Sequence, residues 1–172
     1  MAQPPDVAPD RPRLLLIEAR YYDDVGSALL DGAQSALDAA GAAAQCVTVP
    51  GALEIPFALQ AAIAAGRFAS EAAPADRFDG VVALGCVIRG ETSHYDYVCD
   101  QSIHWLNAIA IEHSIPVGNA ILTTENREQA LIRARGKRPS LDAAMHPGKG
   151  ADAVRACLSV INLAREFKGM TA

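Results

Sequence analysis

The sequence predicts an α/β fold of three layers, in which helices cover both faces of a four-stranded parallel sheet. Short continuous apolar runs, typical of strands buried on both faces, alternate with segments whose apolar residues recur at helical spacing. The 172 residues are 51% hydrophobic and 20% charged, which suits one compact domain with a sizeable core. We therefore expect a single domain over residues 13–172.

Each expected element rests on a local signal. Strands are expected at residues 13–19, 46–49, 80–88 and 116–123, and helices at residues 25–40, 54–65, 95–114, 125–135 and 151–167. Gly41 ends the first helix, and Pro56 falls in the first turn of the second, where its missing N–H group costs little. Connections are expected at residues 66–79 and 138–150. Alternation of strand and helix predicts a parallel sheet.

The composition excludes several classes of protein. Residues 1–12 are polar and rich in proline, so we expect a flexible arm rather than a signal peptide. No run approaches the roughly 18 apolar residues that a membrane-spanning helix needs. The net charge of −5 gives no general attraction for a phosphate backbone. We therefore expect neither a membrane nor a nucleic acid as a partner.

Four cysteines are scattered along the chain without a CxxC pair, namely Cys46, Cys86, Cys99 and Cys157. This spacing argues against a zinc site, which needs closer, paired ligands. In a chain without an export signal these cysteines are expected to be reduced thiols, which indicates a cytoplasmic protein.

The candidate functional residues gather where the expected strands end. In parallel sheets the ligand crevice lies outside the carboxyl ends of the strands. This rule selects four segments, at residues 20–24, 50–54, 86–94 and 123–133. From the residues alone, the prediction is a small-molecule site on an open α/β sheet.

His94 is the first candidate for proton transfer. It follows Thr92 and Ser93 at a strand-to-helix junction, where backbone N–H groups attract an anion and hydroxyl groups add donors. Histidine can move protons at neutral pH. A capped helix start with a solvated histidine explains this position equally well. The other histidines lie away from such junctions, at His104, His113 and His146.

Four further residues have both a functional and a structural explanation. Glu54 could accept hydrogen bonds from hydroxyl groups, but an acidic residue also favours a first helical turn. Tyr21 could stack on a flat heterocycle or pack within its loop. Arg133 suits bidentate recognition of phosphate, although a solvated helix face also explains it. Lys149 lies in a Gly-Lys-Gly sequence before a helix, but the full P-loop pattern is missing.

Three stretches together carry a family resemblance. They are VPGALEIP at residues 49–56, LGCVIRGETSHYDYV at residues 84–98 and TTENREQA at residues 123–130. In content and order they resemble the lumazine synthase family of riboflavin biosynthesis, and the resemblance covers residues 14–167. It implies a flavodoxin-like architecture for the expected sheet.

The resemblance implies a reaction. Members of the family condense 5-amino-6-ribitylaminouracil with 3,4-dihydroxy-2-butanone 4-phosphate, and release 6,7-dimethyl-8-ribityllumazine, phosphate and water. No metal or organic cofactor takes part. An amine attacks a ketone to give an imine, phosphate leaves and a second ring closes, so protons move at each step.

The resemblance also assigns roles by matching position. It implies that His94 is the acid/base residue and that Arg133, with the turn Glu91-Thr92, holds the phosphate group. For Glu91 we expect a backbone contact, with the carboxylate turned away. The residues implied to contact the ribitylaminouracil are Tyr21, Ala52, Leu53, Glu54, Cys86, Val87, Ile88, Asn119 and Lys149.

The resemblance implies a homopentamer with sites at subunit interfaces, and riboflavin synthase as a candidate partner. Asn119 stands where many members place an aromatic that reaches into a neighbouring site, so a hydrogen bond to the ring edge would replace stacking. The extra segment at residues 138–146 is of a kind associated with pentamers that form no shells, so we expect a free pentamer.

Two alternatives stay open. One is an archaeal-type riboflavin synthase, a pentameric relative that consumes lumazine, although the GALE and RGETSH stretches favour the lumazine synthase. The other is a non-catalytic flavin- or lumazine-binding protein. Such a protein would need neither His94 nor Arg133, and this chain has both.

Overall fold

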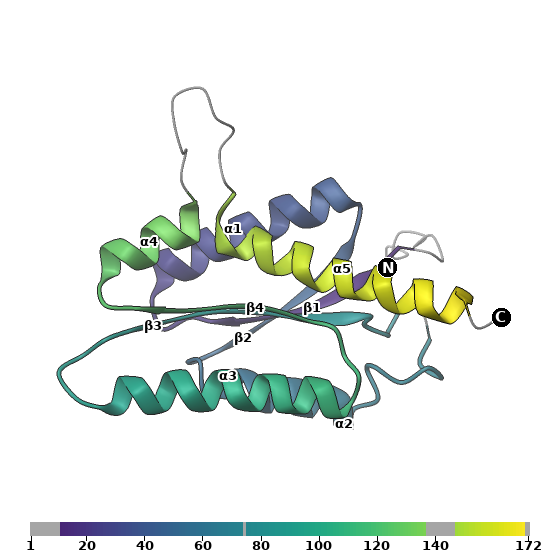
Figure 1. The fold of residues 1–172 in the computed structure, drawn as a ribbon, viewed down its shortest axis with the longest axis horizontal. Coiled ribbons are helices and arrows are strands. Elements are labelled where there is room, and N and C mark those ends of the chain that lie inside the picture. The colour runs from purple at the N-terminus through teal and green to yellow at the C-terminus, as the bar shows by residue number, and fades with distance from the viewer. Residues whose placement is uncertain (1–10, 74, 137–146, 171–172) are drawn as a thin grey trace, which may run out of the picture.

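A sheet of four parallel strands in the order β2-β1-β3-β4 forms the middle layer of the computed structural model (Figure 1). The structure describes residues 11–73, 75–136 and 147–170. The strands are β1 (Arg13–Ala19), β2 (Ala43–Val49), β3 (Gly80–Ile88) and β4 (Val117–Thr124). The predicted four-stranded parallel sheet is confirmed.

Helices cover both faces of this sheet (Figure 1). They are α1 (Asp23–Ala40), α2 (Glu54–Ala64), α3 (His94–Glu112), α4 (Arg127–Arg135) and α5 (Gly148–Met170). One face packs against α1, α4 and α5, and the other against α2 and α3. This arrangement confirms the predicted three-layer, flavodoxin-like fold.

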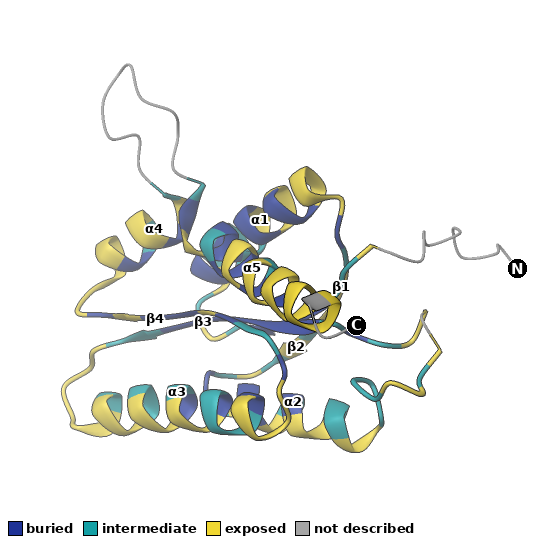
Figure 2. Cartoon of the chain, turned by 45° about the vertical axis from the view of Figure 1, so that its right-hand side comes forward, coloured by how far each residue is buried: buried dark blue, intermediate teal, exposed yellow. Residues whose placement is uncertain are grey.

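The core has two halves, one on each face of the sheet. Along β1, Leu14 and Leu16 point into the half beneath α1 and α5, whereas Leu15 and Ile17 point into the half above α2 and α3. All four side chains are buried, because successive residues of a strand face opposite sides and both sides are covered. Figure 2 shows this burial along the central strands.

β2 departs from the prediction of strands buried on both faces. It begins at Ala43, not at residue 46, and most of its residues are exposed, Cys46 among them. The reason is its place at the edge of the sheet, where it pairs with β1 alone. Polar residues such as Gln45 and Thr48 fit an edge that water reaches.

Most other boundaries agree with the prediction to within two residues. Gly41 ends α1 in the left-handed conformation, with φ of 63°. α4 begins only at Arg127, because the Asn126 side chain accepts a hydrogen bond from Gln129 N and caps the helix.

The prediction of a loop that reaches residue 150 is wrong. α5 begins at Gly148, which has a φ of 81°, and the helix runs to Met170 instead of residue 167. Residues 138–146, the expected extra segment, lie outside the described residues, as do the first ten residues of the expected arm. In the part of the chain that the structure describes, no helix combines the length and apolar character needed to cross a membrane.

Candidate active site

A cavity of about 440 Å³ opens at the carboxyl ends of the strands. It is lined by Tyr21, Tyr22, Pro50, Gly51, Ala52, Leu53, Glu54, Cys86, Val87, Ile88, Gly90, Thr92, His94, Tyr95 and Val98. Three of the four segments selected from the sequence meet here, those that follow β1, β2 and β3. The crevice rule for parallel sheets therefore places them correctly.

Nine predicted site residues line this cavity, namely Tyr21, Ala52, Leu53, Glu54, Cys86, Val87, Ile88, Thr92 and His94. The other four, Glu91, Asn119, Arg133 and Lys149, do not. Those four side chains are exposed. The cavity of one chain therefore holds the aromatic, carboxylate, hydroxyl and imidazole groups, but not the predicted cations.

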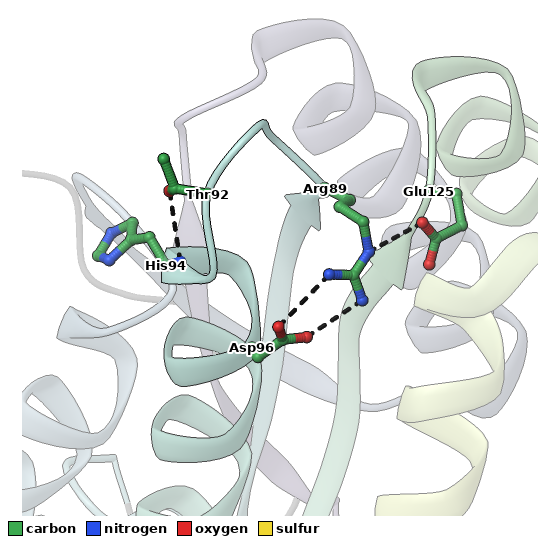
Figure 3. Close-up of polar contacts among 5 residues, drawn as sticks. All are labelled: Arg89, Thr92, His94, Asp96 and Glu125. Atoms are coloured by element: carbon green, nitrogen blue, oxygen red, sulfur yellow. Dashed lines mark hydrogen bonds and ion pairs between the residues drawn. The ribbon is translucent and has the colours of Figure 1, made fainter.

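His94 begins α3 at the rim of the cavity. Its backbone N–H donates to Thr92 Oγ1 at 3.4 Å, so the Thr92 hydroxyl caps the helix start (Figure 3). Ser93, the residue at the cap position itself, makes no side-chain cap bond. The His94 imidazole is exposed, and it projects from the start of the helix. Among the described residues neither ring nitrogen has a hydrogen-bond partner, so both are open to a bound molecule.

Tyr21 offers a ring to the cavity from the end of β1. Its side chain is 72% exposed, and its ring meets that of Tyr22 edge-on at 4.9 Å between centroids. The chain just before it is fixed, because Arg20 pairs with the buried Glu18 carboxylate at 3.0 Å and donates to Ser27 Oγ at 2.9 Å. An open aromatic face on a fixed strand end suits stacking on a flat ring.

Glu54 is the first residue of α2, and its carboxylate lies close to the backbone of Gly51. A Cβ atom at position 51 would approach Glu54 Oε2 to 3.1 Å. Glycine at this position therefore leaves room for the carboxylate beside the turn. An exposed carboxylate at the cavity wall can accept hydrogen bonds from ligand hydroxyl or amine groups.

Cys86 contributes shape to the cavity and not a nucleophile. Burial raises the pKa of its thiol to about 11. The thiol therefore stays protonated at neutral pH, and the thiolate is the reactive form.

The four predicted residues outside the cavity have definite places. Glu91 is exposed in the turn before α3. Arg133 lies in the last turn of α4, on the far side of the sheet from α3, and it has no polar partner among the described residues. Lys149 pairs with Asp152 at 2.9 Å at the start of α5. Asn119 lies on the edge strand β4 and accepts a hydrogen bond from Ile121 N through Oδ1 at 2.8 Å.

Sequence reasoning missed several residues of the cavity. Tyr95 and Val98 line it from the first turns of α3. Val98 could have been found, because a residue four positions after His94 shares its helix face. The sequence also indicated no role for Arg89, which does not line the cavity. Its guanidinium group joins Asp96 and Glu125 beside the turn that carries His94 (Figure 3).

Within the described ranges no group of three or more His, Cys, Asp or Glu side chains is placed to hold a metal ion. An open parallel sheet with a cavity at its strand ends, containing an imidazole, a carboxylate and an open aromatic ring, defines a small-molecule site of the three-layer α/β class. The fold and the site lead no further than this class.

The sequence as a whole identifies the particular family. The profile of the 6,7-dimethyl-8-ribityllumazine synthase family matches residues 11–165. The chain is 47% identical over 160 residues to the 6,7-dimethyl-8-ribityllumazine synthase of Agrobacterium fabrum, which covers 92% of this chain and 99% of that protein. It is 51% identical over 150 residues to 6,7-dimethyl-8-ribityllumazine synthase 1 of Rhizobium meliloti, and this match covers 87% of this chain and 90% of that protein.

The chain therefore belongs to the 6,7-dimethyl-8-ribityllumazine synthase family. The resemblance drawn from three sequence stretches is confirmed, and so is the expectation of an enzyme of riboflavin biosynthesis, here a transferase.

Proposed function

We propose that this chain condenses 5-amino-6-ribitylaminouracil with 3,4-dihydroxy-2-butanone 4-phosphate to give 6,7-dimethyl-8-ribityllumazine, phosphate and water. The observation that carries the proposal is the meeting of Tyr21, Glu54 and His94 in one cavity, from three separate strand ends. The open ring of Tyr21 suits the pyrimidine, and the Glu54 carboxylate suits the polar groups of the ribitylamine.

His94 is the proton carrier in this proposal. Imine formation needs a proton delivered to the departing hydroxyl, phosphate elimination needs one removed from carbon, and ring closure needs another transfer. An exposed imidazole at the cavity rim can reach a bound substrate and exchange its proton with water between steps. Thr92 also lines the cavity, and its hydroxyl group beside His94 N suits a phosphate oxygen.

The phosphate group also needs fixed positive charge, which none of the described residues that line the cavity supplies as Arg or Lys. We propose that a homopentamer places Arg133 of one copy at the cavity of the next, with Asn119 and Lys149 near the same interface. Support comes from large apolar side chains left exposed on α2 and α3, such as Phe57 at 76% and Ile111 at 78%. Exposed apolar surface of this kind is typical of a protein–protein contact.

The test of the reaction is a direct assay. The purified chain is mixed with both substrates, and the fluorescent lumazine and released phosphate are measured against the uncatalysed background. One phosphate per lumazine, formed faster than background, supports the proposal. Tight binding of lumazine or flavin by a folded chain without turnover contradicts it and favours the binding protein. Consumption of lumazine to give riboflavin favours the riboflavin synthase.

Replacement of Arg133 by alanine tests the phosphate assignment. We expect the KM for the butanone phosphate to rise about tenfold, because a hydrogen-bonded ion pair with phosphate is lost. The KM for the ribitylaminouracil should change little. An equal rise in both values, measured by varying each substrate in turn, would show that the phosphate site is misplaced.

The same variant tests whether neighbouring copies share a site. Pentamers assembled from equal amounts of Arg133→Ala and His94→Ala chains are assayed at low butanone phosphate. In such mixtures, about a quarter of shared sites would combine an intact Arg133 with an intact His94 from two copies, because assembly is random. Recovery towards a quarter of wild-type activity is expected. A mixture no more active than the average of its two components would place both residues in one chain.

A further inference from the structure

Arg89 lies at the junction between the sheet and the turn that carries His94. It directly follows β3, and its backbone N–H still donates to Thr124 O of β4 at 2.9 Å. Its guanidinium group donates through Nη2 and Nη1 to the two oxygens of Asp96, at 3.1 and 3.4 Å. Its Nε donates to Glu125 Oε2 at 2.9 Å (Figure 3). One side chain therefore joins the end of β3, the first turn of α3 and the turn after β4.

The guanidinium group also lies over the Tyr95 ring, with Cζ at 4.1 Å from the ring centroid. The hydrogen bond with Asp96 is the largest influence that raises the pKa of Arg89, so the group stays charged. Two carboxylates and the face of an aromatic ring therefore contact the guanidinium group on several sides. A guanidinium group held in this way is poorly available to a substrate phosphate, and its geometry suits a structural tie.

The turn between Arg89 and α3 has few other contacts in the part of the chain that the structure describes. Residues 90–94 are all exposed, and a Cβ atom at Gly90 would meet nothing within 4 Å. Two hydrogen bonds close the turn: His94 N donates to Thr92 Oγ1 at 3.4 Å, and Asp96 N donates to Ser93 O at 3.0 Å. The Arg89–Asp96 pair spans these residues from one end to the other.

We propose that Arg89 is a positioning residue, which holds Thr92 and His94 in place by fixing both ends of their turn. This inference rests on the proposed function and deepens it. The His94 ring projects away from the Arg89–Asp96 pair, so Arg89 acts through the backbone and not by contact with the imidazole (Figure 3). Glu125, which follows β4, pairs with the same guanidinium group. The position of the turn that carries His94 is therefore fixed relative to the end of β4 as well.

The test uses three single variants of the full chain. Arg89→Gln removes the charge, Asp96→Asn removes one acceptor oxygen, and Arg89→Lys keeps the charge but loses the planar fork. We expect kcat to fall about tenfold in each, because a small displacement of a catalytic group lowers the rate steeply. The KM for the ribitylaminouracil should stay within about twofold, since Tyr21 and Glu54 line the cavity from other segments. The KM for the butanone phosphate should rise together with the loss of kcat, because Thr92 belongs to the same turn. The double variant Arg89→Gln with Asp96→Asn should be no slower than the slower single variant, because the pair acts as a unit.

Arg67 provides a matched control at a distance from the cavity. It pairs with Asp76 at 3.5 Å and lies over the Phe78 ring at 5.2 Å, much as Arg89 does with Asp96 and Tyr95. Arg67→Gln should leave kcat unchanged. The midpoints of thermal unfolding of all variants should lie within about 3 °C of wild type, because ion pairs at or near the surface add little stability. If Arg89→Gln does not fold, Asp96→Asn carries the same test.

Three outcomes would overturn the proposal for Arg89. One is a kcat of Arg89→Gln equal to that of Arg67→Gln, and another is full activity of Arg89→Lys. The third is a rise in the KM for the butanone phosphate with kcat unchanged, which would make Arg89 a phosphate ligand. Wild-type chain that forms no lumazine at all would instead contradict the proposed function, so the two failures are distinguishable.

Discussion

Replacing His94 by alanine is expected to lower kcat about 100-fold, the lower end of what a positioned acid/base group contributes. The KM values should change less than threefold, roughly, because the ring lies at the rim and the walls stay intact. A residual rate above the uncatalysed reaction should remain. Holding two substrates together in the cavity removes much of the entropic barrier without any proton carrier.

The measurement is lumazine formation at saturating levels of both substrates, followed by fluorescence. His104 provides a matched control, because it is a second exposed histidine of α3 and does not line the cavity. His104→Ala should keep wild-type kcat. If His94→Ala does the same, another group moves the protons, and the assignment of His94 is wrong.

The sequence predicted buried strands more accurately than the exposed one. β1 and β3 have the expected bounds, residues 13–19 and 80–88, because a continuous apolar run can be accommodated only where both faces are covered. β2 was predicted too short, since it begins with two alanines, which are depleted in strands, and its first residues pair with β1. An edge strand depends on its neighbour more than on its own composition.

The start of α5 was mispredicted for a related reason. Gly148 and Gly150 suggest a loop, yet Gly150 is helical and sits against the carbonyl group of Leu29 in α1. Glycine is present there because two helices approach closely, and a single sequence cannot distinguish this use from a turn.

The site residues that could be predicted are those that follow directly after a strand in the sequence. The crevice rule needs only the strand ends, so it located Tyr21, Glu54 and His94. The Arg89 contacts depend instead on how α3 and the turn after β4 lie relative to each other, which no local pattern encodes. Arg133 lies outside the cavity of one chain, because α4 packs on the other face of the sheet from α3.

The close packing of α5 on β4 leads to the largest expected loss of stability. A Cβ atom at Gly118 would overlap the carbonyl oxygen of Ala153, and would lie 2.7 Å from its carbonyl carbon and 3.2 Å from Cys157 Cβ. Two of these atoms belong to the Ala153 backbone of α5, and Cys157 Cβ is attached directly to the backbone of the same helix, so none of them can rotate away. Gly118→Val should therefore lower the free energy of unfolding by about 3 kcal/mol, the upper range for overpacking.

The measurement is urea unfolding at a fixed protein concentration, because any assembly would make the midpoint depend on concentration. A loss of about 3 kcal/mol corresponds to a midpoint of thermal unfolding roughly 10 °C lower for a chain of this size. Gly169→Ala is the control, since position 169 lies in the same helix with nothing within 4 Å of an added Cβ. It should leave stability unchanged or raise it by up to about 1 kcal/mol, because alanine favours the helix. Equal stability of both variants would mean that α5 can shift on β4, and that the close approach at Gly118 does not fix its place.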